Sequence, residues 1–262
     1  MKKTPKLLIL AGTVLAFLFL FGIIFYNNFI KKSIYEENSQ HLLSTYEQVD
    51  KTFTMFVQHN WNALSDWSNN LQYLDDAENM KTLWYDFARR KDAWQYQDFY
   101  MFNENCDFIT AAGRDGNAPN IQGIFLDMYK TGQPVISSYI ASDSNRRIVF
   151  ALPMEVPYTI NGITYSGLAV SYNNDVVEKL IAGNIYQGQS DCYILTSDGN
   201  VLLSLEPKTE FLQKISNLFD FLNKYTNMTE TEITDLKKNI KNVSTGSLQC
   251  RYNNKNYYLV YE

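Results

Sequence analysis

The stretch LLILAGTVLAFLFLFGIIFYNNFI, residues 7–30, contains no charged side chain and fixes how the rest of the chain is arranged. A helix that crosses the hydrocarbon core of a bilayer needs about 20 apolar residues, and this stretch supplies them. A cleavable signal peptide is the alternative, but its apolar region is usually about 7–15 residues long and ends in small residues. Residues 25–30 (FYNNFI) offer no such cleavage site. The sequence therefore predicts an uncleaved transmembrane anchor over residues 7–30.

The lysines on either side of this anchor predict its orientation. Three lysines and the free amine lie within residues 1–6, whereas Lys31 and Lys32 follow the span. Cytoplasmic flanks carry the excess of lysine and arginine, so the small bias places residues 1–6 in the cytoplasm. We expect a protein of the cell membrane whose body, residues 31–262, lies outside the cytoplasm.

Composition excludes two broad classes of site. A net charge of −5, with no basic stripe outside the flanks of the span, argues against nucleic acid, because phosphate binding needs clustered Lys and Arg. Cys106, Cys192 and Cys250 are odd in number and far apart, which fits neither a disulfide framework nor a metal site. We therefore expect no nucleic-acid partner, no bound metal and no cofactor.

The region that follows the anchor has the pattern of a very long helix. Glycine is absent between Gly22 and Gly113, and a stretch without breakers permits uninterrupted helix. Apolar residues recur at spacings of three and four, which places them in one stripe; they are Leu42, Tyr46, Val49, Phe53, Phe56, Leu64, Trp67, Leu71 and Leu74. A helix over residues 31–74 would be a stalk about 65 Å long.

Two partners are possible for the apolar stripe of this stalk. Its outer part is expected to be buried against the domain, and its inner part is expected either to be buried in the same way or to pair with a second stalk in a homodimer. Asp75 and Glu78 have capping-box spacing, so a second helix is expected from residue 75 to about residue 91. Residues 31–92 form the helical segment of the predicted domain organisation.

Beyond residue 92 the apolar period changes from that of a helix to that of strands, and two modules follow. Residues 93–183 form the first module, with a hairpin, a short helix, three strands and a closing helix; they are expected at 97–102, 107–112, 122–130, 135–140, 148–154, 164–172 and 174–182. The last two of these strands are expected to be joined by a proline-flanked loop and a turn at Asn161-Gly162. Residues 184–262 form the second module, with strands and two helices; they are expected at 191–196, 201–205, 209–225, 229–243, 247–252 and 256–262. Thr229 and Glu232 have capping-box spacing at the start of the second of these helices. Because the chain stops inside a strong strand, we expect the second module to be truncated at its C-terminal end. The fold class is α+β, with an antiparallel sheet and flanking helices in each module.

This order of parts resembles a double Cache domain, the PAS-like extracytoplasmic sensor of bacterial signalling proteins. The most specific stretches are residues 99–113 (FYMFNENCDFITAAG), 150–175, 188–204 (GQSDCYILTSDGNVLLS) and 256–262 (NYYLVYE), which are similar to the sensor halves of clostridial hybrid histidine kinases and diguanylate cyclases. The resemblance implies a membrane-distal module over residues 93–183 and a membrane-proximal module over residues 184–262. The arginine–x–tryptophan–tyrosine signature of amino-acid-binding Cache domains is absent around residues 89–96, which leaves the ligand open and argues against a free amino acid.

Catalysis has little support in the sequence. His41 and His59 are the only histidines, and both lie on the predicted stalk, away from any concave sheet. No Gly-rich phosphate loop is present, and no acid, base or nucleophile can be placed in a site. We therefore expect the residues present to be non-enzymatic.

A sensor instead needs aromatic walls and a few convergent polar groups, which the distal module offers. An arginine can clamp a carboxylate, and an aspartate can receive an amine or hydroxyl. The predicted ligand-binding residues are Arg90, Trp94, Tyr100, Tyr172, Asn173 and Asp175, with the three aromatics expected to surround one cavity. We expect a receptor input domain that binds a small molecule and signals to a cytoplasmic output, a hybrid histidine kinase before a diguanylate cyclase. The alternative is a membrane-anchored adhesion or surface-binding module without an output.

Overall fold

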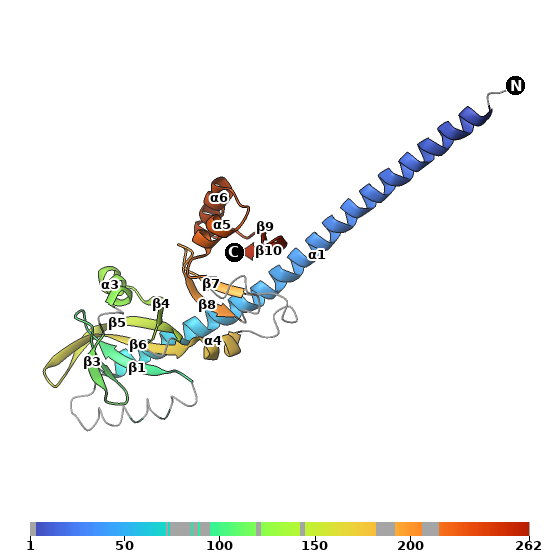
Figure 1. The fold of residues 1–262 in the computed structure, drawn as a ribbon. Helices are drawn as coiled ribbons and strands as arrows, with labels where there is room; N and C mark the ends of the chain where they lie inside the picture. The colour runs from blue at the N-terminus through green and yellow to red at the C-terminus, as the bar shows by residue number, and fades with distance from the viewer. Residues whose placement is uncertain are drawn as a thin grey trace.

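The chain folds as two modules placed along one very long helix (Figure 1). The computed structural model describes residues 4–71, 73, 85, 89, 95–118, 122–141, 145–181, 192–205 and 215–261. Helix α1 (Thr4–Leu71) runs without interruption for 68 residues, which confirms the expected stalk. The second helix expected over residues 75–91 lies outside the described residues, apart from Tyr85 and Arg89.

The apolar surface of α1 is used differently at its two ends. Near the N-terminus large side chains such as Phe19 and Phe25 are exposed, and among the described residues α1 is the one helix long and apolar enough to cross a membrane. Further along, Val49, Leu64 and Leu71 are buried against the distal module. One end of α1 is therefore a candidate membrane span, and the other end is part of a protein core.

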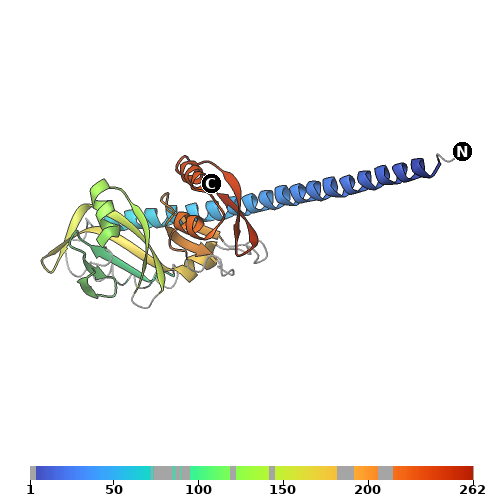
Figure 2. The same cartoon turned by 45° about the horizontal axis from the view of Figure 1, so that its top comes forward.

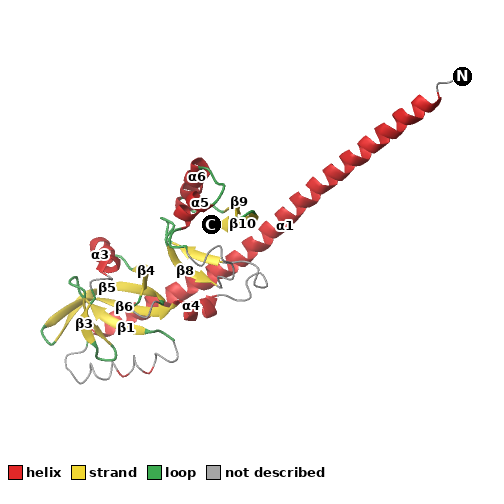
Figure 3. Ribbon diagram, viewed as in Figure 1, coloured by secondary structure: helices red, strands yellow, loops and turns green. Residues whose placement is uncertain are grey.

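A six-stranded antiparallel sheet forms the distal module (Figure 3). Its strand order is β3-β2-β1-β6-β5-β4. The strands are β1 (Asp98–Phe102), β2 (Asp107–Thr110), β3 (Asp115–Asn117), β4 (Val135–Ile140), β5 (Arg146–Ile160) and β6 (Ile163–Asn173). The five longer strands match the expected positions, and β3 was not expected. Helix α3 (Gln122–Thr131) and helix α4 (Asn174–Ile181) also lie where the sequence predicted helices.

The two faces of the distal sheet carry separate cores, because successive side chains of a strand point to opposite faces. On one face Phe99, Phe150 and Tyr172 pack with α1. On the other face Tyr100 and Phe102 pack with α3. The sheet is thus a middle layer, and α1 and α3 cover opposite faces of it (Figure 1).

The hairpin that joins β5 to β6 has the expected tight turn. Asn161 and Gly162 have φ angles of 51° and 80°, which suit a type I′ turn because asparagine and glycine tolerate the left-handed region. The sequence predicted a proline-flanked loop before this turn, but β5 continues through Pro153 and Pro157. The pairing register shifts between Pro153 and Tyr158. Proline has no N–H to donate, so a bulge allows the strand to pass through it.

The proximal module consists of two antiparallel ladders and two helices. Strands β7 (Cys192–Leu195) and β8 (Val201–Leu205) form one ladder, and β9 (Gly246–Tyr252) and β10 (Lys255–Tyr261) form the other. Helices α5 (Leu218–Tyr225) and α6 (Glu230–Lys241) pack with the second ladder. Thr229 and Glu232 form the predicted capping box of α6. Figure 2 shows this module beside α1, between the distal sheet and the free N-terminal half of the helix.

Candidate functional site

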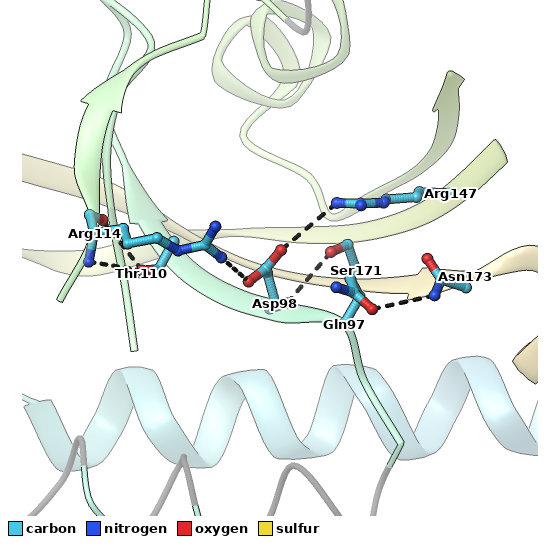
Figure 4. A network of polar contacts seen from close by, with 7 residues as sticks. All are labelled: Gln97, Asp98, Thr110, Arg114, Arg147, Ser171 and Asn173. Atoms are coloured by element: carbon cyan, nitrogen blue, oxygen red, sulfur yellow. Dashed lines mark hydrogen bonds and ion pairs between the residues drawn. The ribbon is translucent and has the colours of Figure 1, made fainter. Parts of the chain in front are cut away.

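Polar side chains gather on the α3 face of the distal sheet, at the end of β1 and β6 that lies nearest α4. We call this group the distal polar cluster, and Figure 4 draws all of its members except Tyr100. It consists of Gln97, Asp98, Tyr100, Arg114, Arg147, Ser171 and Asn173. The registers Asp98↔Ser171 and Arg147↔Asn173 place β1, β6 and β5 side by side there. The strand pairing therefore brings together residues that are far apart in the sequence.

Asp98 lies between two arginines and is the electrostatic centre of the cluster (Figure 4). Arg114 Nη2 donates to Asp98 Oδ1 at 2.6 Å, and Arg147 Nη1 lies 3.6 Å from Asp98 Oδ2. The Arg114 side chain is 68% exposed, whereas those of Asp98 and Arg147 are 18% and 16% exposed. The pair of Asp98 with Arg147 is therefore the one shielded from water, where an ion pair is least screened.

The β6 side of the cluster is held by hydrogen bonds to β1 and to the residue before it. The Gln97 N–H donates to the Ser171 carbonyl at 2.7 Å, and Ser171 Oγ donates to the Asp98 carbonyl at 3.4 Å. Asn173 Nδ2 donates to Gln97 Oε1 at 3.1 Å. These contacts fix the positions of the Asn173 amide and the Asp98 carboxylate relative to each other.

Two residues of the cluster, Tyr100 and Asn173, each bury an oxygen that accepts no hydrogen bond from the described residues. These atoms are the hydroxyl oxygen of Tyr100 and the amide oxygen Oδ1 of Asn173. Burial raises the pKa of Tyr100 well above its ordinary value, and nearby Tyr139 and Asp98 raise it further, so the hydroxyl keeps its proton. Buried polar groups without partners are rare in folded proteins because each costs free energy. The Asn173 oxygen can accept a hydrogen bond, and the Tyr100 hydroxyl can donate or accept one.

The chemistry of the cluster suits recognition better than catalysis. It contains no histidine, cysteine or serine–base pair, and among the described residues no group of three His, Cys, Asp or Glu side chains is placed to hold a metal ion. It does combine a carboxylate, a shielded guanidinium, a phenol and an amide, which are groups that orient a small polar molecule.

The residues predicted from the sequence to bind a ligand are only partly brought together. Tyr100 and Asn173 belong to the cluster, whereas Arg90 and Trp94 lie outside the described residues. Tyr172 faces α1 and donates to Asn60 Oδ1 at 2.9 Å. Tyr100 and Tyr172 therefore lie on opposite faces of the sheet, which corrects the expectation that they share a cavity. Asp175 is exposed in the first turn of α4, where a carboxylate favours the helix dipole.

Sequence reasoning missed the charged members of the cluster. Asp98, Arg114 and Arg147 stand in or next to strands, and Arg147 follows directly after Arg146. A largely buried strand rarely carries a charged residue without a partner. Charged residues at the start of two predicted strands were therefore a signal, but their pairing depended on the strand order.

Comparisons with known proteins were made at the level of sequence and of fold. No protein-family model and no curated protein matches the sequence. Among solved structures, the ligand-binding domain of the Pseudomonas aeruginosa PAO1 chemoreceptor PctB in complex with L-Arg is similar with a TM-score of 0.58 and 11% identity, over 84% of this chain and 79% of that one. The extracellular domain of the histidine kinase mmHK1S-Z3 gives 0.56 and 13%, over 83% and 89%.

The sensory domain of the Campylobacter jejuni chemoreceptor Tlp3 with isoleucine bound has a TM-score of 0.51 and 12% identity, over 87% of this chain and 86% of that one. At these identities the likeness concerns the fold. The fold is that of Cache-type extracytoplasmic sensor domains, as the resemblance in the sequence implied.

Proposed function

We propose that this chain is the extracytoplasmic input domain of a single-chain membrane receptor and that it binds a small polar molecule at the distal polar cluster. The observation that carries the proposal is the pair of buried polar atoms, Tyr100 Oη and Asn173 Oδ1, beside the shielded ion pair of Asp98 with Arg147. A ligand with an N–H or O–H donor for Asn173 would satisfy this site. PctB and Tlp3 are described with arginine and isoleucine bound, so amino acids are included among the compounds to be tested, although this sequence lacks the amino-acid signature.

The receptor proposal also assigns a topology and partners. Residues 7–30 would cross the lipid bilayer, residues 1–6 would be cytoplasmic, and residues 31–262 would lie outside. The output would be a hybrid histidine kinase in the first instance and a diguanylate cyclase in the second. The coding sequence beyond Glu262 tests this point: a second apolar span followed by a signalling domain supports a receptor, and cell-wall repeats would support the adhesion module instead.

We also propose that α1 pairs with a second copy of itself along the side that carries Ile34 and Met55. Ile34 and Met55 are large apolar residues, 51% and 64% exposed, and they lie three heptads apart on α1. Positions a whole number of heptads apart face the same partner in a coiled coil. Replacing Met55 by cysteine should allow oxidative crosslinking of the chain in membranes, and a chain that stays monomeric under oxidant would contradict the pairing.

Ligand binding is tested by comparing two tyrosine variants of the full-length chain in detergent. Thermal unfolding is followed with a panel of L-amino acids, polyamines and small carboxylic acids, since a ligand of the native state raises the midpoint. Tyr100→Phe removes a buried hydroxyl that has no partner among the described residues, so the unliganded midpoint should stay the same or rise while the ligand shift falls.

Tyr129→Phe is the matched control on the same face of the sheet. The Tyr129 hydroxyl donates to the Phe102 carbonyl at 3.2 Å and accepts from Ser166 at 3.1 Å. Its loss should lower the midpoint and leave the ligand shift in place. The site assignment is wrong if Tyr100→Phe keeps the full shift, and the sensor proposal fails if no compound stabilises the parent chain.

A further inference from the structure

The ends of β5 and β6 next to α4 carry two pairs of neighbouring residues that serve two different parts of the molecule. Arg147 and Asn173 belong to the distal polar cluster. Arg146 and Asn174, each one position away, contact the proximal strand β8 instead. Arg146 and Arg147 are successive strand residues and point to opposite faces of the sheet, and Asn174 begins α4 directly after Asn173, so the backbone itself joins the two sets of contacts.

The contacts with β8 form a small polar seam between the modules. Arg146 Nη1 donates to the Val201 carbonyl at 2.8 Å and to Ser138 Oγ at 3.0 Å. Ser138 Oγ also donates to the Val201 carbonyl at 3.2 Å, and Asn174 Nδ2 donates to the Ser204 carbonyl at 3.2 Å. We call these five residues the seam. Three distal side chains thus hold two carbonyl groups of a single proximal strand.

The seam lies against apolar packing that is shared by both modules. Leu203, between the two acceptor residues on β8, is fully buried in the same core as Ile148 and Val177 of the distal module. When the distal sheet is displaced, the β7–β8 ladder therefore either follows it or slides against it at Leu203. Hydrogen bonds are directional, so the seam sets which of these arrangements is favoured.

Arg146 is the charged member of the seam. Its guanidinium is partly buried, and burial lowers its pKa from the ordinary value. Its hydrogen-bond acceptors among the described residues are neutral oxygens, which stabilise a desolvated cation less than a carboxylate does.

We propose that the seam transmits the state of the distal polar cluster to the β7–β8 ladder, through the backbone shared by Arg146 with Arg147 and by Asn173 with Asn174. The physiological trigger rests on the proposed ligand-binding function, but the coupling itself does not. A change in the Asp98–Arg147 contact displaces the end of β5, and Arg146 carries that displacement to Val201. The proximal module, which also contacts α1, then receives the signal.

The test uses hydrogen exchange of the full-length chain in detergent and needs no ligand. Asp98→Asn weakens the ion pair with Arg147, and Arg146→Gln removes the charged member of the seam. In the parent background, Asp98→Asn should speed amide exchange in residues 192–205 by about threefold or more, because local opening follows the loss of contacts. In the Arg146→Gln background the same change should add less than about 1.5-fold, since coupled sites are non-additive.

Two further variants separate coupling from a general loss of stability. Asp107→Asn removes a charge from β2 outside the cluster, where Asn117 Nδ2 donates to Asp107 Oδ1 at 2.8 Å, and should leave exchange in residues 192–205 unchanged. Asn173→Ala perturbs the cluster from the β6 side and replaces Asp98→Asn if that variant does not fold. Equal acceleration by the cluster variant in both backgrounds would overturn the proposal. Failure of the ligand screen would leave this result standing, so the two proposals are tested separately.

Discussion

The hydroxyl of Tyr172 donates a hydrogen bond of 2.9 Å to Oδ1 of Asn60, and this bond joins β6 to α1 inside the core. Asn60 is 1% exposed and its Nδ2 donates to the Phe56 carbonyl one turn earlier at 2.8 Å. A buried polar pair in a largely apolar interface favours one axial position and one rotation of the helix, because any slip leaves both groups buried without partners. The distal sheet therefore holds α1 in a defined register.

Removing this bond from one side should be costly. Tyr172→Phe leaves Asn60 Oδ1 buried without its partner and should lower the free energy of unfolding by about 1–3 kcal/mol, measured by urea titration of the chain in detergent. The double variant Tyr172→Phe with Asn60→Leu should recover part of that loss, since both polar groups are then gone. The exposed Tyr225→Phe serves as the control. A change as small as that of Tyr225→Phe would mean that the bond does not hold the helix.

Trp67 provides the apolar counterpart of that bond. Its ring lies 4.3 Å from the ring of Phe99 in an edge-to-face contact, and the residue is 6% exposed. Trp67→Ala should lower the free energy of unfolding by about 3–5 kcal/mol through lost burial and the cavity left behind. Asp66→Ala, on the exposed side of the same turn, should change it by less than about 0.5 kcal/mol. Equal effects of the two variants would show that this part of α1 is not packed on the sheet.

Val243 occupies a backbone conformation that valine disfavours. It follows α6 with a φ of 51° and is exposed, so side-chain burial does not compensate the strain. Val243→Asn should raise the free energy of unfolding by about 1 kcal/mol, because asparagine tolerates the left-handed region and valine does not. Val156→Asn, an exposed valine in β5, should give no such gain. A lower stability of Val243→Asn would contradict this explanation.

The capping box of α6 gives an acid-dependent contribution to stability. The Thr229 N–H and hydroxyl donate to Glu232 Oε2 at 2.7 and 2.8 Å, and these bonds lower the pKa of Glu232 below its ordinary value. A lowered folded-state pKa means that the contribution is present above the ordinary glutamate pKa and is lost as the pH falls through the folded value. The parent should therefore exceed Glu232→Gln in stability at neutral pH, and the difference should disappear as the pH falls below the lowered folded-state pKa of Glu232. A gap that stays constant with pH would rule out the charge as its source.

Much of the fold was predictable because it follows from local patterns. The three–four spacing gave α1, the Asn161–Gly162 pair gave a hairpin, and Thr229 with Glu232 gave the start of α6. Strand β3 was missed because its three residues, Asp115–Asn117, are exposed and show no apolar alternation. Its pairing with β2 supplies a stability that the sequence of β3 alone does not reveal.

The site was harder to predict than the fold because it depends on register. The sequence shows which residues of one strand share a face, because alternate residues do. It does not show which residue of β6 lies opposite a given residue of β1, since the two strands are far apart in the chain. The observed register places Tyr100 opposite Ala169, so Tyr100 shares a face with the odd-numbered residues of β6 and not with Tyr172. A shift by one residue would have reversed this result. The same long-range register brings Asp98 to Arg147.

The unbroken course of α1 from Thr4 to Leu71 has a consequence for any signal that it carries. A helix without a hinge moves as a rigid body. A displacement imposed where the distal sheet packs against α1 therefore reaches the membrane end as a rotation or translation of the whole helix. Each residue of an α-helix turns it by about 100°, so two residues inserted between the anchor and the contact with the distal sheet would rotate the anchor by roughly half a turn about the helix axis. Seven inserted residues would return the anchor to its original orientation about the helix axis to within about 20°. The number of residues between the anchor and the contact with the distal sheet thus determines the rotational orientation of the anchor relative to the sheet.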